Sequence, residues 1–580
     1  MKRFATYAAA LAATLLAATA LHAQDIAHRK ADLTVQVQTG SGTPLEGATV
    51  EIEMLNHAFR FGTAVNIGKL EQANGQYDPK TVEEITKYFN SITFENAMKW
   101  GSYENSTPSR IVSLANLAKS YKAFNGPDDF RLRGHVTLWS QQMPNSARSL
   151  TDPDELNQRA LDHVEAFHTT LKDVGIDSFD LYNEHMRAPA DLIDKIVPSK
   201  NLAEQATIVA AWFNKAKEVD PNANLFVNDY NILNFWNNND QFVVEYKEYI
   251  DAVRDAGGQI DGIGLQAHMD RFITKEQITR RLDLLAAPMA PTANHPDGLP
   301  GLRIEITELD INDQQWSNAT DEQEAEVTQN VLEGAFEHPS VDGVTIWVIN
   351  DGSHWRGNAI LFDDSDPNNW VVKQSGQVWI DKVLNEWWQD HSGASATNGA
   401  YTANTFKGTH RVTVTFNGET KEEIVALDDD NTITVNFAAE AADAATYDAW
   451  TAFITWGQAS NLRDADPDDD GLTNLDEYLI GSDPLEAAPS PTVPKIQQTD
   501  GNALSIDFLT RAQGASFLIE YSQNLTTWTP IDQLAWPDVV PTPQLDLKQT
   551  QLPNGQTRHT LELSNIVGFF RITLSEPSQS

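Results

Sequence analysis

Hydrophobic and polar positions follow two different periods along this chain. Between Asp32 and Met54, apolar residues occupy every second position on both sides of a Gly- and Pro-containing turn, which predicts a β-hairpin. From Phe59 to about Trp388, short apolar runs alternate with long segments in which apolar residues recur every three or four positions. These segments predict amphipathic helices, of which the clearest are Leu156–Leu171, Ala203–Glu218 and Asp321–Phe336.

Eight strand-like runs alternate with the helical segments. Eight strands and helices over roughly 330 residues predict an α/β fold, the (β/α)8 barrel, because that fold needs about 250 residues plus insertions. A doubly wound open sheet is the alternative, but no glycine-rich phosphate loop follows the first strand. The eight runs are Phe59–Val65, Ser91–Asn96, Leu132–Trp139, Ser178–Glu184, Leu225–Asp229, Gly262–Gln266, Arg303–Glu308 and Gly343–Trp347.

The segment that follows the barrel again has the hydrophobic pattern of β-strands. The segment His391–Ala400 is rich in small residues and predicts a linker. Three strand-like runs follow it, at Arg411–Phe416, Glu422–Leu427 and Thr432–Phe437. Because the two ends of a domain commonly lie close together, we predict that residues 399–438 complete one small β-sandwich with residues 32–55. The barrel of residues 56–392 would then be inserted into this sandwich, which resembles the carboxypeptidase regulatory or transthyretin-like kind. Two unrelated β-fragments are the alternative.

A further β-domain is predicted at the end of the sequence. Residues 445–485 hold a short helical segment and an acidic loop, and the Pro-rich stretch Ala487–Pro494 is typical of a linker. Residues 495–577 are β-patterned and predict a separate β-sandwich.

The first residues have the pattern of a secretory signal. Lys2 and Arg3 precede an apolar run that is followed by small residues up to Ala23. We expect residues 1–23 to be removed and the mature protein to be secreted, periplasmic or exposed at the cell surface. A membrane anchor is the alternative, but the run is short for a spanning helix.

Composition narrows the possible partners. The net charge is −41, so a nucleic-acid phosphate backbone would be repelled, as would an anionic membrane surface. The chain contains no cysteine, which excludes disulfides, thiolate metal sites and a cysteine nucleophile. No hydrophobic feature requires more than a monomer.

Polar residues stand at the ends of the predicted barrel strands. Active sites of (β/α)8 barrels lie at the carboxyl ends of the strands. Glu184 and Glu308 end the fourth and seventh runs, which lie on opposite sides of such a barrel. Glycoside hydrolysis needs a carboxyl pair of this kind, because one group protonates the leaving oxygen and the other attacks or activates water.

Seven motifs carry a resemblance to a known family. FNSITFENAMKW, RGHVTLW, FDLYNE, LFVNDYNI, DGIGLQAHM, RIEITELDI and WVINDGSHWR occur in this order between Phe89 and Arg356. They resemble glycoside hydrolase family ten, whose members are mainly endo-1,4-β-xylanases, over about Phe59–Trp388. The resemblance implies a retaining enzyme that acts on xylan or xylo-oligosaccharides without a catalytic cofactor. It also implies that Glu184 is the acid/base, that Glu308 is the nucleophile, and that His268 and Asp310 orient the nucleophile.

The resemblance also implies a set of sugar contacts. Glu95, Asn96 and Lys99 match a motif that grips the xylose beyond the cleavage point, and Trp347 and Trp355 match two tryptophans that wall the cleavage subsite. The other matching or polar positions at the barrel mouth are His135, Trp139, Gln142, Asn183, Asn228, Tyr230 and Gln266.

Two positions depart from the family pattern. Ser140 stands where a histidine is usual, and Val348 replaces a glycine after Trp347. A catalytically weak or non-catalytic xylan-binding barrel and a related β-1,4-glycanase are therefore kept as alternatives to a secreted endo-1,4-β-xylanase.

The acidic loop has the spacing of a calcium site. DPDDDGLTNLDE places oxygen ligands at the expected positions and Gly471 at the sharp turn. An acidic turn in a very acidic chain is the alternative. The predicted ligands of a structural Ca²⁺ are Asp466, Asp468, Asp470, the Leu472 carbonyl, Asn474 and Glu477.

Overall fold

The structure is a computed structural model, and it describes most of the chain between residues 26 and 575. The described residues exclude 41, 73–74, 187–190, 235–239, 312–314, 317, 368, 438–450, 452–453, 455, 458, 470–471, 481–483, 486–494, 500–502, 511–515, 523–528, 531–543, 552–556 and 565–568. The predicted signal at residues 1–23, Asp470 and part of the short helical segment predicted within residues 445–485 lie outside the described residues.

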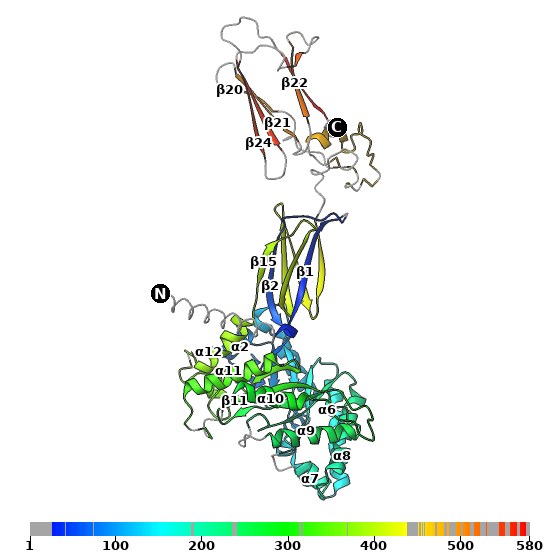
Figure 1. Cartoon of the computed structure of the whole chain (residues 1–580), viewed down its shortest axis with the longest axis vertical. Coiled ribbons are helices and arrows are strands. Elements are labelled where there is room, and N and C mark those ends of the chain that lie inside the picture. Colours follow the sequence, from blue (N-terminus) through cyan, green and yellow to red (C-terminus); the bar gives the residue numbers. More distant parts are fainter. Residues whose placement is uncertain are drawn as a thin grey trace, which may run out of the picture.

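Eight parallel strands close into a barrel, which confirms the predicted (β/α)8 fold (Figure 1). Closure is complete because β12 (Val341–Ile346) pairs with β3 (Arg60–Val65), and β9 (Gly262–Leu265) pairs with β11 (Arg303–Ile311). Each of the eight predicted runs holds one barrel strand. The other strands are β4 (Ser91–Phe94), β5 (Arg131–Gly134) with its extension β6 (Leu138–Trp139), β7 (Ser178–Asn183), β8 (Asn224–Asp229) and the short β10 (His268–Met269) beside β11.

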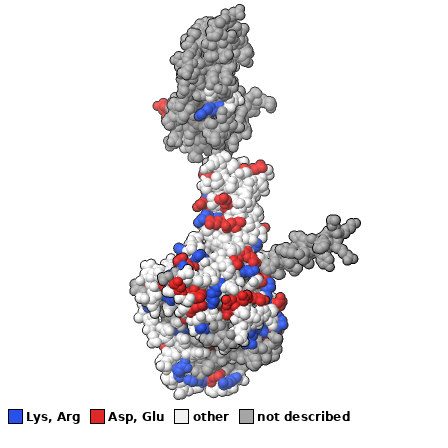
Figure 2. Space-filling view, turned by 90° about the vertical axis from the view of Figure 1, so that its left-hand side faces the viewer, with Lys and Arg blue, Asp and Glu red and all other residues white. Residues whose placement is uncertain are grey.

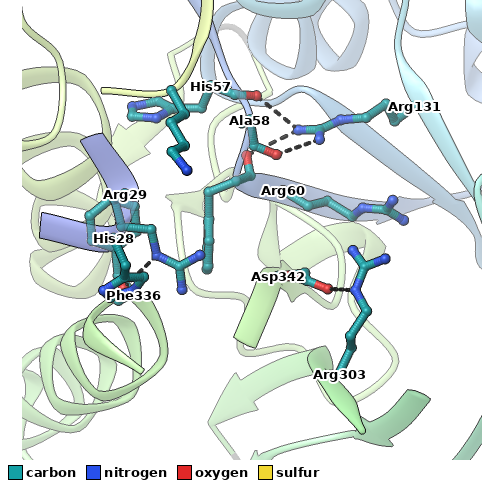
Figure 3. A pocket seen from close by; sticks show the side chains of 11 residues that line it. His28, Arg29, His57, Ala58, Arg60, Arg131, Arg303, Phe336 and Asp342 are labelled. Carbon is teal, nitrogen blue, oxygen red and sulfur yellow. Dashed lines mark hydrogen bonds and ion pairs between the residues drawn. The ribbon is translucent and has the colours of Figure 1, made fainter. Parts of the chain in front are cut away.

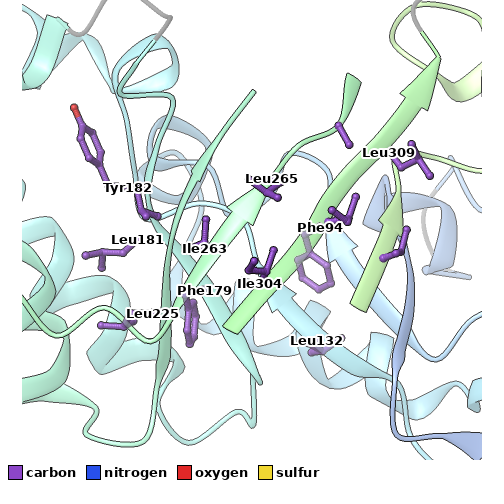
Figure 4. Close-up of a cluster of buried hydrophobic side chains, with 14 of the residues drawn as sticks. Phe94, Leu132, Phe179, Leu181, Tyr182, Leu225, Ile263, Leu265, Ile304 and Leu309 are labelled. Atoms are coloured by element: carbon purple, nitrogen blue, oxygen red, sulfur yellow. The ribbon is translucent and has the colours of Figure 1, made fainter. Parts of the chain in front are cut away.

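Helices follow the barrel strands, and several begin at side-chain caps. Thr274 and Thr320 form capping boxes with the glutamines three residues later, which satisfies the first free N–H groups of two helices. Apolar side chains from β4, β5, β7, β8, β9 and β11 share one buried cluster (Figure 4). The helices are α2 (Pro79–Tyr88), α3 (Trp100–Glu104), α4 (Pro108–Ser120), α5 (Asn145–Arg148), α6 (Pro153–Leu171), α7 (Asp191–Ile196), α8 (Leu202–Val219), α9 (Gln241–Asp255), α10 (Lys275–Ala286), α11 (Asp321–Glu337) and α12 (Gln374–Ile380).

A β-sandwich is formed by two segments, one that precedes the barrel in the sequence and one that follows it. β1 (Lys30–Thr39) lies between β16 (Ala400–Phe406) and β19 (Asn431–Phe437) in one sheet. The second sheet has the order β15 (His391–Ala394), β2 (Thr49–His57), β17 (Gly408–Phe416) and β18 (Glu419–Leu427). The barrel chain therefore leaves this sandwich after β2 and returns to it at β15.

Two sequence predictions for this region were wrong. β1 and β2 do not form a hairpin, because they lie in opposite sheets and their apolar faces meet across the core through residues such as Val35 and Ile52. Alternation predicts which face of a strand is buried but not which strand pairs with it. The predicted linker at His391–Ala400 begins instead with strand β15, which pairs with β2.

The last part of the chain forms two antiparallel sheets. One has the order β20 (Lys495–Thr499), β21 (Ala503–Thr510), β25 (Thr557–Ser564) and β24 (Gln544–Gln551), and the other has β23 (Thr529–Pro530), β22 (Ser516–Ser522) and β26 (Phe569–Ser575). Helix α14 (Asn474–Ile480) precedes them.

Figure 2 shows Asp and Glu side chains in patches over the barrel and the sandwich, with Lys and Arg side chains between them. Among the described helices, none combines the length and the apolar character that crossing a bilayer requires.

Candidate active site

A cavity of about 500 Å³ opens at the carboxyl ends of the barrel strands. Its walls combine three tryptophans with carboxylates, amides and cations, which suits a ligand that has flat apolar faces and a rim of hydroxyl groups. Most predicted site residues line it: Glu95, Asn96, Lys99, His135, Trp139, Gln142, Glu184, Tyr230, Gln266, His268, Glu308, Trp347 and Trp355. Gln141 and Arg356, which the sequence analysis did not select, line it as well.

Glu308 is held by a donor on each carboxylate oxygen. It lies on β11 with only 5% of its surface exposed. Asn228 donates its amide to Oε1 at 3.2 Å, and Nε2 of His268 lies 3.3 Å from Oε2. Both donors stabilise the ionised carboxylate, since a hydrogen bond to the charged form favours it.

Asn228 was predicted to contact the sugar, but its side chain contacts Glu308. Its side chain is fully buried behind the cavity wall, where it supports Glu308 instead of facing a ligand. Gly264 on the neighbouring strand makes room for it, because a Cβ there would lie 2.5 Å from Asn228 Oδ1. Asn183 is also buried, and its side-chain oxygen accepts a hydrogen bond from Gln266 at 3.2 Å.

Asp310 stabilises the charged form of His268. Nδ1 of His268 lies 2.9 Å from Asp310 Oδ2. Burial opposes a charged ring, but the Asp310 charge and hydrogen bond, followed by those of Glu308, raise the pKa of His268 to about 10. Two further donors hold Asp310: Trp355 Nε1 at 3.0 Å and His354 Nε2 at 3.1 Å.

Glu184 experiences a different environment. It follows β7 with a positive φ of 58°, and burial, together with the nearby charge of Glu308, raises its pKa. Its two oxygens accept single amide hydrogen bonds, from Gln266 at 3.2 Å and from Gln141 at 3.0 Å. Of the two glutamates, Glu184 is therefore the one whose burial favours the protonated form.

A buried chain of charges connects the barrel interior to the cavity. Arg133 pairs with Asp180 and Glu305 inside the barrel. Asp180 lies 2.9 Å from Nδ1 of His135, and the same nitrogen is 4.0 Å from Glu308 Oε1. The orientation of His135 at the cavity surface is thus set by residues deeper in the barrel.

Lys99 contributes a cation to one wall. Its ammonium group lies 5.1 Å from the ring centre of Trp139 and 6.0 Å from that of Trp347, and it donates to Asn96 at 3.0 Å. Burial lowers the pKa of Lys99. The predicted neighbours Asn96 and Lys99 are brought together here.

The two departures from the family pattern lie beside the site. The Ser140 side chain is buried away from the cavity, where its hydroxyl accepts a hydrogen bond from the backbone N–H of Leu192 at 3.3 Å. The next residue, Gln141, reaches the cavity in its place. Val348 adopts a φ of 68°, a conformation that favours glycine.

The fold and the site together define a barrel enzyme of the glycoside hydrolase class. Two glutamates in contrasting environments share a cavity walled by aromatic and polar side chains. A family model, glycosyl hydrolase family 10, matches residues 52–372, more than half of the 580 residues. The chain belongs to this family.

Curated relatives fall into two kinds. The anti-sigma-I factor RsgI6 of Acetivibrio thermocellus is 29% identical over 397 residues, which cover 68% of this chain and only 46% of that protein. Endo-1,4-beta-xylanase 3 of Hypocrea jecorina is 29% identical over 307 residues, 52% of this chain and 77% of that protein. Xylanase 10B of Thermotoga petrophila, solved with xylobiose, is 23% identical, with a TM-score of 0.45 over 57% of this chain and 94% of that one.

The ion pair of His268 with Asp310 predicts a pH-dependent stability. A group whose pKa rises on folding stabilises the fold fully below its unfolded pKa of about 6.5, and this contribution is lost as the pH rises toward about 10. We expect the free energy of unfolding to fall across this interval, by up to about 1.4 kcal/mol per pH unit. Denaturant unfolding followed by tryptophan fluorescence measures it.

The matched variants are His268→Gln and His163→Gln. Burial lowers the pKa of His163, so this ring loses no stabilising charge as the pH rises through the interval in the way that His268 does. His163→Gln should keep the pH dependence of the wild type, whereas His268→Gln should lose it. Equal pH dependence in all three proteins would contradict the assignment.

Proposed function

We propose that this protein is a retaining endo-1,4-β-xylanase in which Glu184 is the acid/base and Glu308 the nucleophile. The observation that carries the proposal is the contrast between the two carboxyl groups. Burial and the charge of Glu308 favour a protonated Glu184, whereas one Glu308 oxygen lies 3.3 Å from a cationic ring and the other accepts a hydrogen bond from an amide. Double displacement needs this difference.

The reaction would proceed in two balanced steps. In the first, a Glu308 oxygen forms a bond to the anomeric carbon while the glycosidic C–O bond breaks, and Glu184 gives its proton to the departing oxygen. In the second, ionised Glu184 takes a proton from water, the water oxygen bonds to the anomeric carbon, and the bond to Glu308 breaks. Two inversions at one carbon retain the configuration of the sugar.

Xylan is the substrate that the site and the relatives favour. Tryptophan faces suit the flat faces of a sugar chain, Glu95 and Lys99 offer charged hydrogen bonds to its hydroxyl groups, and Asn96 offers neutral ones. The name of the Hypocrea jecorina relative describes activity on xylan. The name of the Acetivibrio thermocellus relative describes a regulator, which is why a binding protein is kept as the second candidate.

Hydrolysis by the two glutamate variants tests the proposal. Glu184→Gln and Glu308→Gln should each lower the rate of reducing-sugar release from xylan by about 10³-fold or more, because each removes an essential proton donor or nucleophile. Glu71→Gln is the matched control, since Glu71 pairs with Arg110 on the barrel surface away from the cavity. It should keep the wild-type rate.

Other outcomes select the alternatives. A wild-type protein that binds xylan without releasing sugar would contradict the enzymatic proposal and favour the binding protein. Faster release from β-1,4-glucan or mannan than from xylan would favour the related glycanase.

We also propose that the acidic loop at residues 466–477 holds a structural Ca²⁺. The Asn474 side-chain nitrogen donates to the carbonyls of Ser460 and Leu462, while its oxygen is buried and accepts no hydrogen bond from any described residue. Glu477 is fully buried and stands at the twelfth position of the loop, where calcium loops carry a glutamate ligand. Asp470 lies outside the described residues, and the described ones alone hold no group of three His, Asp or Glu around a common point.

Calorimetric titration of the full chain with Ca²⁺ tests this site. We expect saturable uptake that Asp468→Asn weakens by about tenfold or more, because it removes one ligand charge. Asp464→Asn, just before the loop, should leave the affinity unchanged. Absence of saturable uptake by the wild type would overturn the proposal.

We also propose that the N-terminal segment directs export of the protein. The basic, apolar and small-residue order of residues 1–23 supports it, and xylan itself lies outside cells. We propose a monomer that acts on it there.

A further inference from the structure

A second cavity lies at the opposite end of the barrel, where its strands begin (Figure 3). It has a volume of about 240 Å³. Arg60, Arg131 and Arg303 stand at the amino ends of β3, β5 and β11, and Arg29 and Lys407 come from the chain of the sandwich. The cavity therefore lies where the barrel meets the sandwich. Its remaining lining residues are His28, His57, Ala58, Phe59, Phe336 and Asp342.

The side chains that line this cavity are mostly positively charged, whereas the chain as a whole is negatively charged. The chain carries a net charge of −41, yet four arginines and one lysine line the cavity with a single carboxylate, Asp342. That carboxylate pairs with Arg303, and the Arg60 guanidinium lies 3.7 Å from Glu305 Oε1 and donates to Ser178 Oγ inside the barrel. Lys407 lies 3.2 Å from Asp429, but the Asp429 side chain is 92% exposed, so solvent screens this pair.

Arg29 and Arg131 are bonded to neutral groups. Arg29 donates to the carbonyls of Phe336, His338 and Val341 at 2.6–2.9 Å, around the end of helix α11. Arg131 donates to three successive carbonyls, those of His57, Ala58 and Phe59. These bonds position the guanidinium groups without cancelling their charge, and burial lowers the pKa of each only to about 10, so both remain cations at neutral pH.

Several buried nitrogen atoms of the lining side chains have no hydrogen-bond partner among the described residues. The Nε atoms of Arg60 and Arg131 make no hydrogen bond with any described residue. The Nε2 atoms of His28 and His57 are also buried without a partner in the described part of the chain. Arg60 is 9% exposed and His57 is 3% exposed, so water replaces these bonds poorly.

The neighbouring cations also act on one another. Burial, followed by the charge of Arg29, lowers the pKa of His28 to about 4, and the charge of Lys407 acts in the same direction. Arg60 adds to the effect of burial on Arg131. A negatively charged ligand would relieve this repulsion.

We propose that this cavity is a binding site for a small oxyanion, either free phosphate or the carboxylate of an acidic sugar. Guanidinium groups bind both through paired charge-assisted hydrogen bonds. The volume accommodates either ligand but not a polysaccharide chain. Because Arg29 and Lys407 belong to the sandwich chain and Arg60, Arg131 and Arg303 to the barrel, the bound anion links the two domains at their junction.

Calorimetric titration of the full chain with sodium phosphate and, separately, with sodium glucuronate tests the site. An ionic strength of about 0.15 M suppresses weak surface association. Two variants change the charge of the cavity in opposite directions. Lys407→Met should weaken anion binding by about tenfold, since it removes one charged donor. Asp342→Asn should tighten it by about threefold or more, since it removes the repelling carboxylate.

Lys421→Met is the matched control. Lys421 pairs with Glu419 in the sandwich and does not line the cavity, so the affinity should be that of the wild type. Saturable binding of phosphate alone identifies a free anion as the ligand, and saturable binding of glucuronate identifies an acidic sugar. No saturable heat with either anion, or equal affinities in wild type, Lys407→Met and Asp342→Asn, would overturn the proposal.

Discussion

The buried carboxylates of the barrel impose the constraint on which the site depends. Asp180, Glu305, Glu308 and Asp310 are each at most 5% exposed. Burying a carboxylate is costly unless a cation or several hydrogen bonds compensate it. Arg133 compensates Asp180 and Glu305 below the cavity. His268 lies between Asp310 and Glu308 at the cavity wall, and its charge serves both.

This compensation separates the two glutamates chemically. Glu308 lies within the network of cations and amides, and removal of its charge would leave His268 with one carboxylate fewer. Glu184 lies at the edge of the network, where the amides of Gln266 and Gln141 donate to it and burial raises its pKa. The two glutamates therefore have different environments because of their positions in one continuous arrangement of charges, and the proposed acid/base and nucleophile roles need that difference.

The sequence predicted those parts of the structure that repeat or that carry a motif. Each barrel strand could be located because short apolar runs alternate with helical segments, and Glu184 and Glu308 stand at the ends of two of these runs. The depth of a side chain could not be predicted: Asn228 follows the same pattern but lies behind the wall. Gln141 was not predicted, because the sequence analysis singled out the preceding residue, Ser140. Asp180 and His354 were not predicted, because their hydrogen-bond partners are distant in sequence. The pairing of β1 was not predicted either, because its partners β16 and β19 are distant in sequence.

The most direct test of the account is to identify the residue that bonds to the sugar. A 2-deoxy-2-fluoro-xylobioside with a good leaving group slows both steps of a retaining reaction, so that the covalent intermediate accumulates. Mass spectrometry of the digested protein should find the sugar on the peptide that contains Glu308, and Glu308→Gln should take up none. An unlabelled wild type that still hydrolyses xylan, or a label on Glu184, would contradict the assignment of the nucleophile.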